Sequence, residues 1–188
     1  MKFRATILVL MAFVLISCNK EVEIDDVEMV GKWTMVAYDY SGSNTISSTS
    51  YSLKTDFVGV LKESDFILEF KSNPNTYETS KSYIIELSSE VSDLIIDGEV
   101  AFEGYTDVQE AEIVDYESDG TWSITGDMLS GLNFISSEAN PTGSQSSDYQ
   151  ITKLTNTKME LDFSVSQTTQ QQGATALVEA EGTIVFEK

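Results

Sequence analysis

The sequence predicts an all-β fold, an antiparallel up-and-down β-barrel, with a β-sandwich as the alternative architecture. Apolar and polar residues alternate with a period of two in many short segments, which is typical of half-buried strands. Turn-forming residues separate these segments, and no segment stands out as an amphipathic helix. About nine to eleven such segments follow residue 30, at the regular spacing expected of a barrel or sandwich.

The expected strands follow one another from Trp33 onward. The first covers residues 33–40, and a second alternates over residues 51–57, where the density of Ser and Thr argues against a helix. Later strands are expected near residues 66–71, 83–88, 122–125, 128–129, 149–154, 159–163 and 178–186.

Turn chemistry separates the expected strands. Turns are expected at residues 73–75, 97–98, 119–120, 126–127 and 155–157, where Asn, Asp, Gly, Pro and Thr gather. Residues 41–50, 136–147 and 167–175 are low in apolar side chains, so we expect surface loops or ragged strand ends there.

A set of aromatic side chains is predicted to face the inside of the fold, as core or as the lining of a ligand cavity. These residues are Trp33, Phe66, Phe70, Tyr83, Trp122 and Phe163. An eight-stranded barrel is just wide enough either to be filled by side chains or to hold one small ligand. Both outcomes remain open from the sequence.

Composition excludes several functional classes. The chain has 188 residues, a formal net charge of -20 and no histidine. Its acidity opposes binding to nucleic acid, and the missing histidine removes Ser-His-Asp and Cys-His catalysis together with His-ligated metal sites. We expect no enzyme activity, no catalytic residue, no cofactor and no metal.

Two acidic patterns in the sequence bear on that expectation. Asp115, Glu117 and Asp119 alternate before Gly120, like the start of an EF-hand calcium loop, but the twelfth position is Gly126 instead of a bidentate Glu. Glycosidases use a pair of carboxylates, and acids such as Glu103, Glu110 and Glu112 could in principle form one. In a chain with 31 acidic residues, however, such pairs arise by chance.

The first 17 residues are predicted to be a cleaved signal peptide. Lys2 and Arg4 precede a largely apolar run over residues 5–16, which is shorter than the roughly 20 residues needed to span a bilayer. Leu15-Ile16-Ser17-Cys18 resembles the lipobox of bacterial lipoproteins. The resemblance implies cleavage between Ser17 and Cys18 and a diacylglyceryl group on the Cys18 sulfur. Residues 18–29 would then be an acylated acidic tether, and two or more acyl chains anchor a protein stably.

The tether also predicts where the protein resides. Lys20, Glu21 and Glu23 resemble the acidic export tag of some Gram-negative lipoproteins, which implies an outer-membrane location. The sequence leaves open whether the protein stands on the periplasmic or the cell-surface face. A membrane partner is expected through the acyl chains, because the acidic body repels anionic lipid headgroups.

Residues 30–188 resemble a lipocalin-like domain. Gly31-Lys32-Trp33 resembles the Gly-x-Trp motif at the first strand of lipocalins, and residues 119–127, 149–161 and 182–188 are similar to later hairpins and the last strand of lipocalin-like lipoproteins. The family commonly stacks an arginine over this Trp ring. No arginine follows Arg4 in this chain, so only a lysine or an apolar residue is expected over Trp33.

The expected function follows from the anchor and the barrel. We expect a lipid-anchored envelope protein that binds a small apolar or amphipathic molecule without catalysis. The alternative is a solidly packed module whose loops contact another envelope protein or a glycan.

Overall fold

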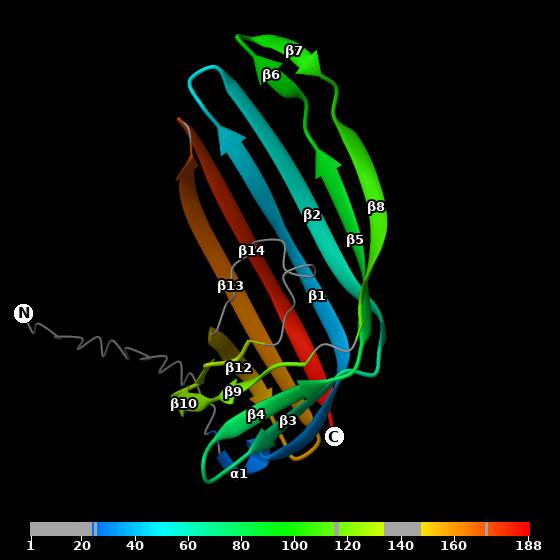
Figure 1. Cartoon of the computed structure of the whole chain (residues 1–188), viewed down its shortest axis with the longest axis vertical. Helices are drawn as coiled ribbons and strands as arrows, with labels where there is room; N and C mark the ends of the chain where they lie inside the picture. The colour runs from blue at the N-terminus through cyan, green and yellow to red at the C-terminus, as the bar shows by residue number, and fades with distance from the viewer. Residues whose placement is uncertain (1–23, 25, 115–116, 134–147, 172) are drawn as a thin grey trace, which may run out of the picture.

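The computed structural model describes residue 24 and residues 26–114, 117–133, 148–171 and 173–188 (Figure 1). The predicted signal peptide, the cleavage site between Ser17 and Cys18, and the export-tag residues lie outside the described residues, as do Asp115 and residues 136–147.

Within the described residues, one short helix precedes a 14-stranded sheet. The elements are α1 Asp26–Met29, β1 Gly31–Ser47, β2 Tyr51–Ser64, β3 Ile67–Lys71, β4 Thr76–Ser80, β5 Tyr83–Val91, β6 Leu94–Ile96, β7 Glu99–Phe102, β8 Tyr105–Ile113, β9 Asp119–Thr121, β10 Ser123–Thr125, β11 Met128–Ser130, β12 Asp148–Leu154, β13 Lys158–Gln171 and β14 Ala174–Glu187. All pairings are antiparallel and most join consecutive strands, so the prediction of an all-β, antiparallel up-and-down fold is confirmed.

The two ends of the sheet differ. We call the end that carries α1 and Lys188 the lower end, and the end that carries β6 and β7 the upper end (Figure 1). At the lower end β1 pairs with β3, β3 with β4 and β4 with β9, while β10, β11, β12, β13 and β14 lead back to β1. Only Trp122 separates β9 from β10, so the lower end forms a barrel-like circuit.

The upper end is a curved sheet of long strands. Here β13, β14, β1, β2, β5 and β8 lie side by side, and the upper parts of β13 and β8 form its two edges (Figure 1). This arrangement leaves one face of the upper sheet as the continuation of the inner face of the barrel-like end.

The core fills the lower end. Trp33 and Met35 point inward from β1, and a β-bulge between Met35 and Ala37 shifts the alternation, so that Tyr38 and Tyr40 also point inward. Large side chains that are almost completely buried surround them, including Leu68, Tyr77, Tyr149, Leu161, Ile184 and Phe186.

Three sequence expectations need correction. Asp26–Met29 of the predicted tether is helical and Met29 is fully buried, so the folded body begins before residue 30. Asp119 and Gly120 are not a turn but part of β9, where the Tyr77 ring lies against Gly120. The polar residues 41–47 and 167–171 belong to strands, because their backbones pair along the full ladders of β1, β13 and β14.

Candidate functional site

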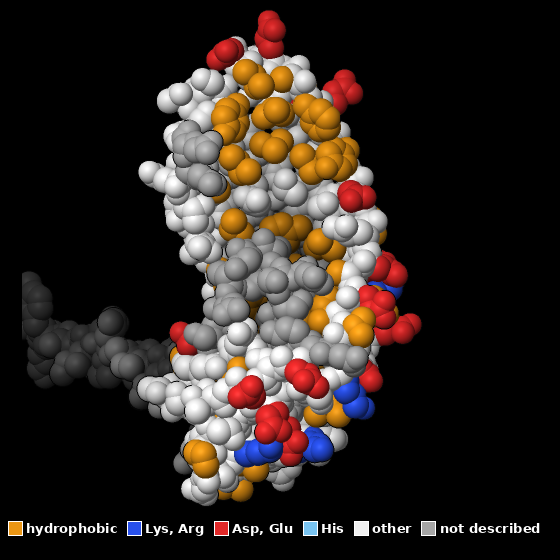
Figure 2. Space-filling view, in the orientation of Figure 1, with side chains coloured by type: hydrophobic (Ala, Val, Ile, Leu, Met, Phe, Trp, Pro, Cys, Tyr) orange, Lys and Arg blue, Asp and Glu red, His pale blue; other side chains and the backbone are white. Residues whose placement is uncertain are grey.

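An apolar surface covers the inner face of the upper sheet, and we call it the upper apolar face. Its side chains come from β1, β2, β5, β6, β7, β8 and β14: Ile46, Tyr51, Leu53, Val91, Leu94, Ile96, Phe102, Tyr105 and Val178. Figure 2 shows apolar side chains gathered at the upper end of the molecule.

The register of the strands places these residues on one face. Ile46 pairs with Leu53 across β1 and β2, and Tyr51 pairs with Ile96 across β2 and β6. Val91 pairs with Tyr105. Because directly paired residues point to the same side of a sheet, the apolar side chains of β1, β2, β5, β6 and β8 share the inner face, with Thr55 lying between Leu53 and the core and opposite Val91.

Small residues separate the core from the upper apolar face. Gly42 pairs with Ala180 at mid-height on the inner face, and a Cβ at Gly42 would come within 2.7 Å of the Phe57 ring. The Phe57 ring therefore occupies the space that a side chain at position 42 would need. Above this level the inner-face side chains are no longer fully buried.

Several members of the upper apolar face are strongly exposed. Ile96, Phe102 and Tyr105 expose 40%, 50% and 53% of their surfaces. The rings of Phe102 and Tyr105 pack edge to face, with centroids 6.0 Å apart and planes at 85°. Since each residue leaves about half of its surface exposed among the described residues, the two rings present an aromatic surface to solvent.

Hydrogen bonds hold the β6–β7 hairpin in place beside the sheet. The Ser92 amide donates to the Lys54 carbonyl over 2.8 Å, and the Lys54 amide donates to Ser92 Oγ over 2.9 Å. The Gly104 amide donates to Asp93 Oδ1 over 2.8 Å, and a Cβ at Gly104 would overlap the Val91 carbonyl oxygen. The hairpin is thereby fixed at both of its ends, so the aromatic pair has a defined position.

Exposed carboxylates lie at the top of the upper apolar face and along its β8 side. They come from the β5–β6 connection, the β6–β7 hairpin, the β7–β8 connection and β8: Asp93, Asp97, Glu99, Glu103 and Asp107. No lysine or arginine occurs between Lys81 and Lys153. Lys54, which is hydrogen-bonded to Ser92 beside the hairpin, forms an ion pair with Asp56, with Nζ 2.7 Å from Oδ1. The rim is therefore strongly negative.

The structure places most of the predicted aromatic set in the packed core. Trp33, Phe66, Phe70, Tyr83 and Trp122 are each no more than 4% exposed. Phe70 packs on Trp122 with ring centroids 5.5 Å apart, and Phe66 packs on Tyr83 at the same separation. These residues do not line the upper apolar face.

Phe163 occupies a different position from the rest of that set. It is only partly buried, and its ring centroid lies 6.1 Å from Tyr38 and 6.3 Å from Tyr149. It marks the upper boundary of the core on β13. The sequence did not point to Ile46, Leu53, Phe102 or Tyr105 as ligand-lining residues. One signal was available, because β6 carries apolar residues on both of its faces and one face must then lack a packed neighbour.

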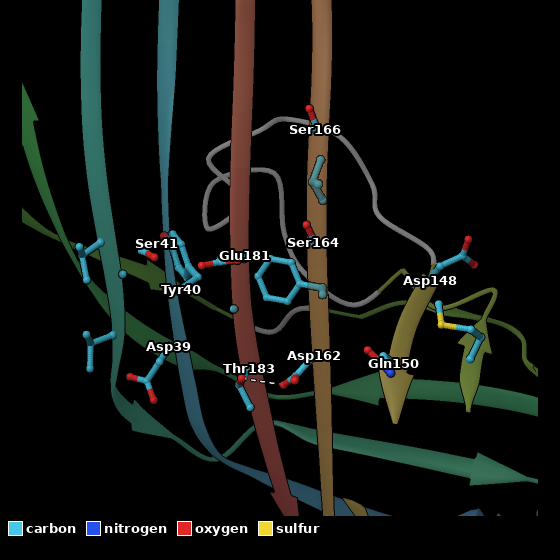
Figure 3. Close-up of a pocket in the computed structure, with 17 residues that line it drawn as sticks. Asp39, Tyr40, Ser41, Asp148, Gln150, Asp162, Ser164, Ser166, Glu181 and Thr183 are labelled. Atoms are coloured by element: carbon cyan, nitrogen blue, oxygen red, sulfur yellow. Dashed lines mark hydrogen bonds between the residues drawn. The ribbon is translucent and has the colours of Figure 1, made fainter. Parts of the chain in front are cut away.

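A hollow lies on the outer face of the sheet, with a volume of about 1080 Å³ (Figure 3). Its lining combines polar and apolar residues and includes the acids Asp39, Asp148, Asp162 and Glu181, and Asp162 accepts a 2.7 Å hydrogen bond from the Thr183 hydroxyl. No group of three or more His, Cys, Asp or Glu side chains among the described residues is placed to share a metal ion. The groove offers solvated acids and hydroxyls but no histidine to act as a base.

Comparisons with known proteins do not assign a family. No family model matches the sequence, and no curated protein matches it. A solved structure with some similarity is that of Ail, the attachment invasion locus protein of Yersinia pestis. The match has 6% sequence identity and a TM-score of 0.23, and covers 84% of this chain and 99% of that chain. Similarity at this level carries no argument about fold or function.

The described part of the chain contains no helix with the length and apolar character needed to cross a bilayer.

Proposed function

We propose that the chain is a lipid-anchored lipoprotein of the bacterial envelope that binds an apolar or amphipathic molecule on its upper apolar face, without catalysis. The observation that supports this proposal is the exposure of Ile96, Phe102 and Tyr105 on the inner face of a sheet whose lower end is packed. A contiguous apolar surface with a polar rim is typical of a binding site. Removing apolar surface from water stabilises a complex by about 25 cal/mol per Å² before the cost of association.

The proposed site is not the internal cavity that a hollow barrel would have. The core aromatic side chains contact one another, so a ligand among them would have to displace Phe70 from Trp122 or Phe66 from Tyr83. On the upper apolar face a ligand would contact side chains that the described residues leave partly exposed. This makes the open half of the sheet the favoured location.

The lipid anchor is proposed from the lipobox-like residues Leu15-Ile16-Ser17-Cys18. The folded body begins at α1, at the lower end, whereas the upper apolar face lies at the far end of β1 and β2 (Figure 1). A 17-residue strand spans about 55 Å, so the proposed site would stand well away from an anchor attached at the lower end. An outer-membrane location is part of the same proposal and is supported by the acidic residues after Cys18.

A packed interaction module is the second candidate function. It is favoured by the lower end, where the aromatic residues are completely enclosed. In that case the outer groove and the strand edges would contact another envelope protein or a glycan, and the upper apolar face would bind no free amphiphile.

A binding measurement separates the two candidates. Every described strand and the whole core lie between Met29 and Lys188, so a chain that begins at Asn19 retains them. We would titrate this chain with the neutral apolar dye N-phenylnaphthylamine and record its fluorescence. We expect saturable binding that is lost in the double variant Phe102→Ser, Tyr105→Ser.

A matched control exists on the same hairpin. Ile95 and Val100 pair with each other on the opposite face and expose 47% and 57% of their surfaces. The double variant Ile95→Ser, Val100→Ser removes comparable apolar surface from the same two strands and is expected to bind the dye as the parent chain does. Absence of saturable binding by the parent chain would favour the packed module.

A further inference from the structure

We propose that the ligand of the upper apolar face is a cationic amphipathic peptide. This inference rests on the proposed function and adds the chemical class of the ligand. It is supported by the charge around the face and by the size of the face.

The charge around the face selects a cation. Asp97 and Glu99 stand at the tip of the β6–β7 hairpin, Glu103 lies in the β7–β8 connection, and Asp107 follows Tyr105 on β8. All four are exposed. Since the ion pair with Asp56 engages Lys54, the rim is left without a neutralising cation among the described residues. Carboxylates of one sign around an apolar surface attract cations and repel anionic amphiphiles.

The width of the face selects a peptide. The inner face at this level extends from Val178 on β14 to Tyr105 on β8, along a register row that also contains the polar residues Asn44 on β1 and Thr55 on β2. Four strand spacings of roughly 4.8 Å give a width of about 19 Å. A helix with its side chains is about 10–12 Å in diameter, so one amphipathic helix covers the centre of such a face and still reaches both margins. A single acyl chain is much narrower and would leave most of the apolar side chains in water.

The arrangement assigns a role to each part of the face. Apolar side chains of the peptide would pack on Ile46, Leu53 and Phe102. Lysine and arginine stems would extend over the margin and place their charges beside Asp97, Glu99 and Asp107. The exposed rings of Phe102 and Tyr105 add surfaces on which an arginine or lysine stacks favourably.

The test compares three synthetic 18-residue amphipathic peptides with the same leucine face and with lysine, glutamate or glutamine on the polar face. Binding to the chain that begins at Asn19 is measured by fluorescence anisotropy at low salt. We expect the lysine peptide to bind at least about tenfold more tightly than the glutamine peptide, and the glutamate peptide to bind most weakly. The advantage of the lysine peptide should shrink as salt screens the exposed rim.

Two sets of variants locate the interaction. Asp97→Asn, Glu99→Gln and Asp107→Asn together should weaken the lysine peptide about tenfold and leave the neutral dye unchanged. Glu63→Gln, Glu117→Gln and Glu187→Gln together change the net charge equally in the lower half and should have much less effect. Phe102→Ser with Tyr105→Ser should abolish binding of both ligands, whereas Ile95→Ser with Val100→Ser should not. Circular dichroism verifies that each variant is folded.

The outcomes distinguish this inference from the proposed function. If the dye binds at Phe102 and Tyr105 but the lysine peptide binds no better than the glutamine peptide, the peptide inference is overturned and the proposed function stands. If neither the dye nor any peptide binds, both are overturned. If the two sets of charge variants weaken the lysine peptide equally, the peptide is held by general charge alone and the inference is overturned.

Discussion

The ammonium nitrogen of Lys188 lies 4.3 Å from the ring centroid of Trp33. The same nitrogen donates hydrogen bonds to the carbonyl oxygens of Glu28 and Val30, over 2.8 Å and 3.0 Å. The Trp33 indole nitrogen in turn donates a 2.7 Å hydrogen bond to the Met29 carbonyl. Lys188 therefore joins the end of β14 to α1 and closes the lower end over the Trp33 ring. The sequence allowed only a lysine or an apolar residue over the Trp33 ring, and the structure has a lysine there.

Lys188→Ala should destabilise the fold by about 1–2 kcal/mol, because it removes one cation–π contact and two hydrogen bonds to carbonyls. Lys188→Arg keeps the charge and should lose much less. Urea unfolding followed by tryptophan fluorescence measures both. Equal stability of Lys188→Ala and the parent chain would show that the contact with Trp33 contributes nothing.

Tyr40 should make the fold sensitive to alkaline pH. Burial, with a smaller contribution from Tyr83, raises the pKa of Tyr40 from 10.0 to about 12. Because the folded-state pKa is the higher one, the stabilisation is fully present below pH 10 and is lost as the pH rises toward 12. Between these values the unfolded chain releases its proton and the folded chain retains it.

Tyr40→Phe removes this group while keeping the ring. The parent chain should therefore lose stability more steeply than Tyr40→Phe between about pH 10 and 12, with the difference in slope approaching one proton. Urea unfolding at several pH values in this range gives the two slopes. Identical slopes would mean that Tyr40 ionises as easily in the folded state as in the unfolded state.

The sequence predicted the core better than the upper sheet, for a physical reason. Trp33, Phe66 and Trp122 are large apolar residues in alternating segments, and such residues are buried in most folds. The β-bulge after Met35 was not predictable, because it depends on how β1 pairs with both β14 and β3. Residues 41–47 were predicted as a loop or strand end because local composition does not report pairing with distant strands.

The upper apolar face was missed because alternation does not reveal what covers a strand. Tyr51 and Leu53 alternate with polar residues just as Leu68 and Phe70 do. Only the assembled sheet distinguishes them, since Leu68 is 0% exposed and lies in the closed lower end, whereas Leu53 lies where the described strands leave the inner face open.

Gly59 should tolerate no side chain while Tyr40 is present. Gly59 pairs with Tyr40 across β1 and β2, and an added Cβ would overlap the Tyr40 ring. Gly59→Ala should therefore cost about 1–3 kcal/mol, through displacement of that ring. In a chain that carries Tyr40→Leu the added methyl group has more room, so the same substitution should cost at least about 1 kcal/mol less. Urea unfolding of the four chains gives the coupling energy, and simple additivity would contradict the proposed overlap.

Cys18 should account for all membrane attachment. Its expected acyl chains bind the bilayer, whereas a chain with 31 acidic residues against 11 basic ones is repelled by anionic lipids. Cys18→Ser should therefore move the protein from the membrane to the soluble fraction. Because an uncut signal peptide would also hold the variant in the membrane, the residues from Asn19 onward are expressed in parallel behind a cleavable secretory signal that lacks a lipobox. This second chain should be entirely soluble even at low salt. If it still sediments with membranes, the folded body itself binds lipid and the lipoprotein proposal loses its basis.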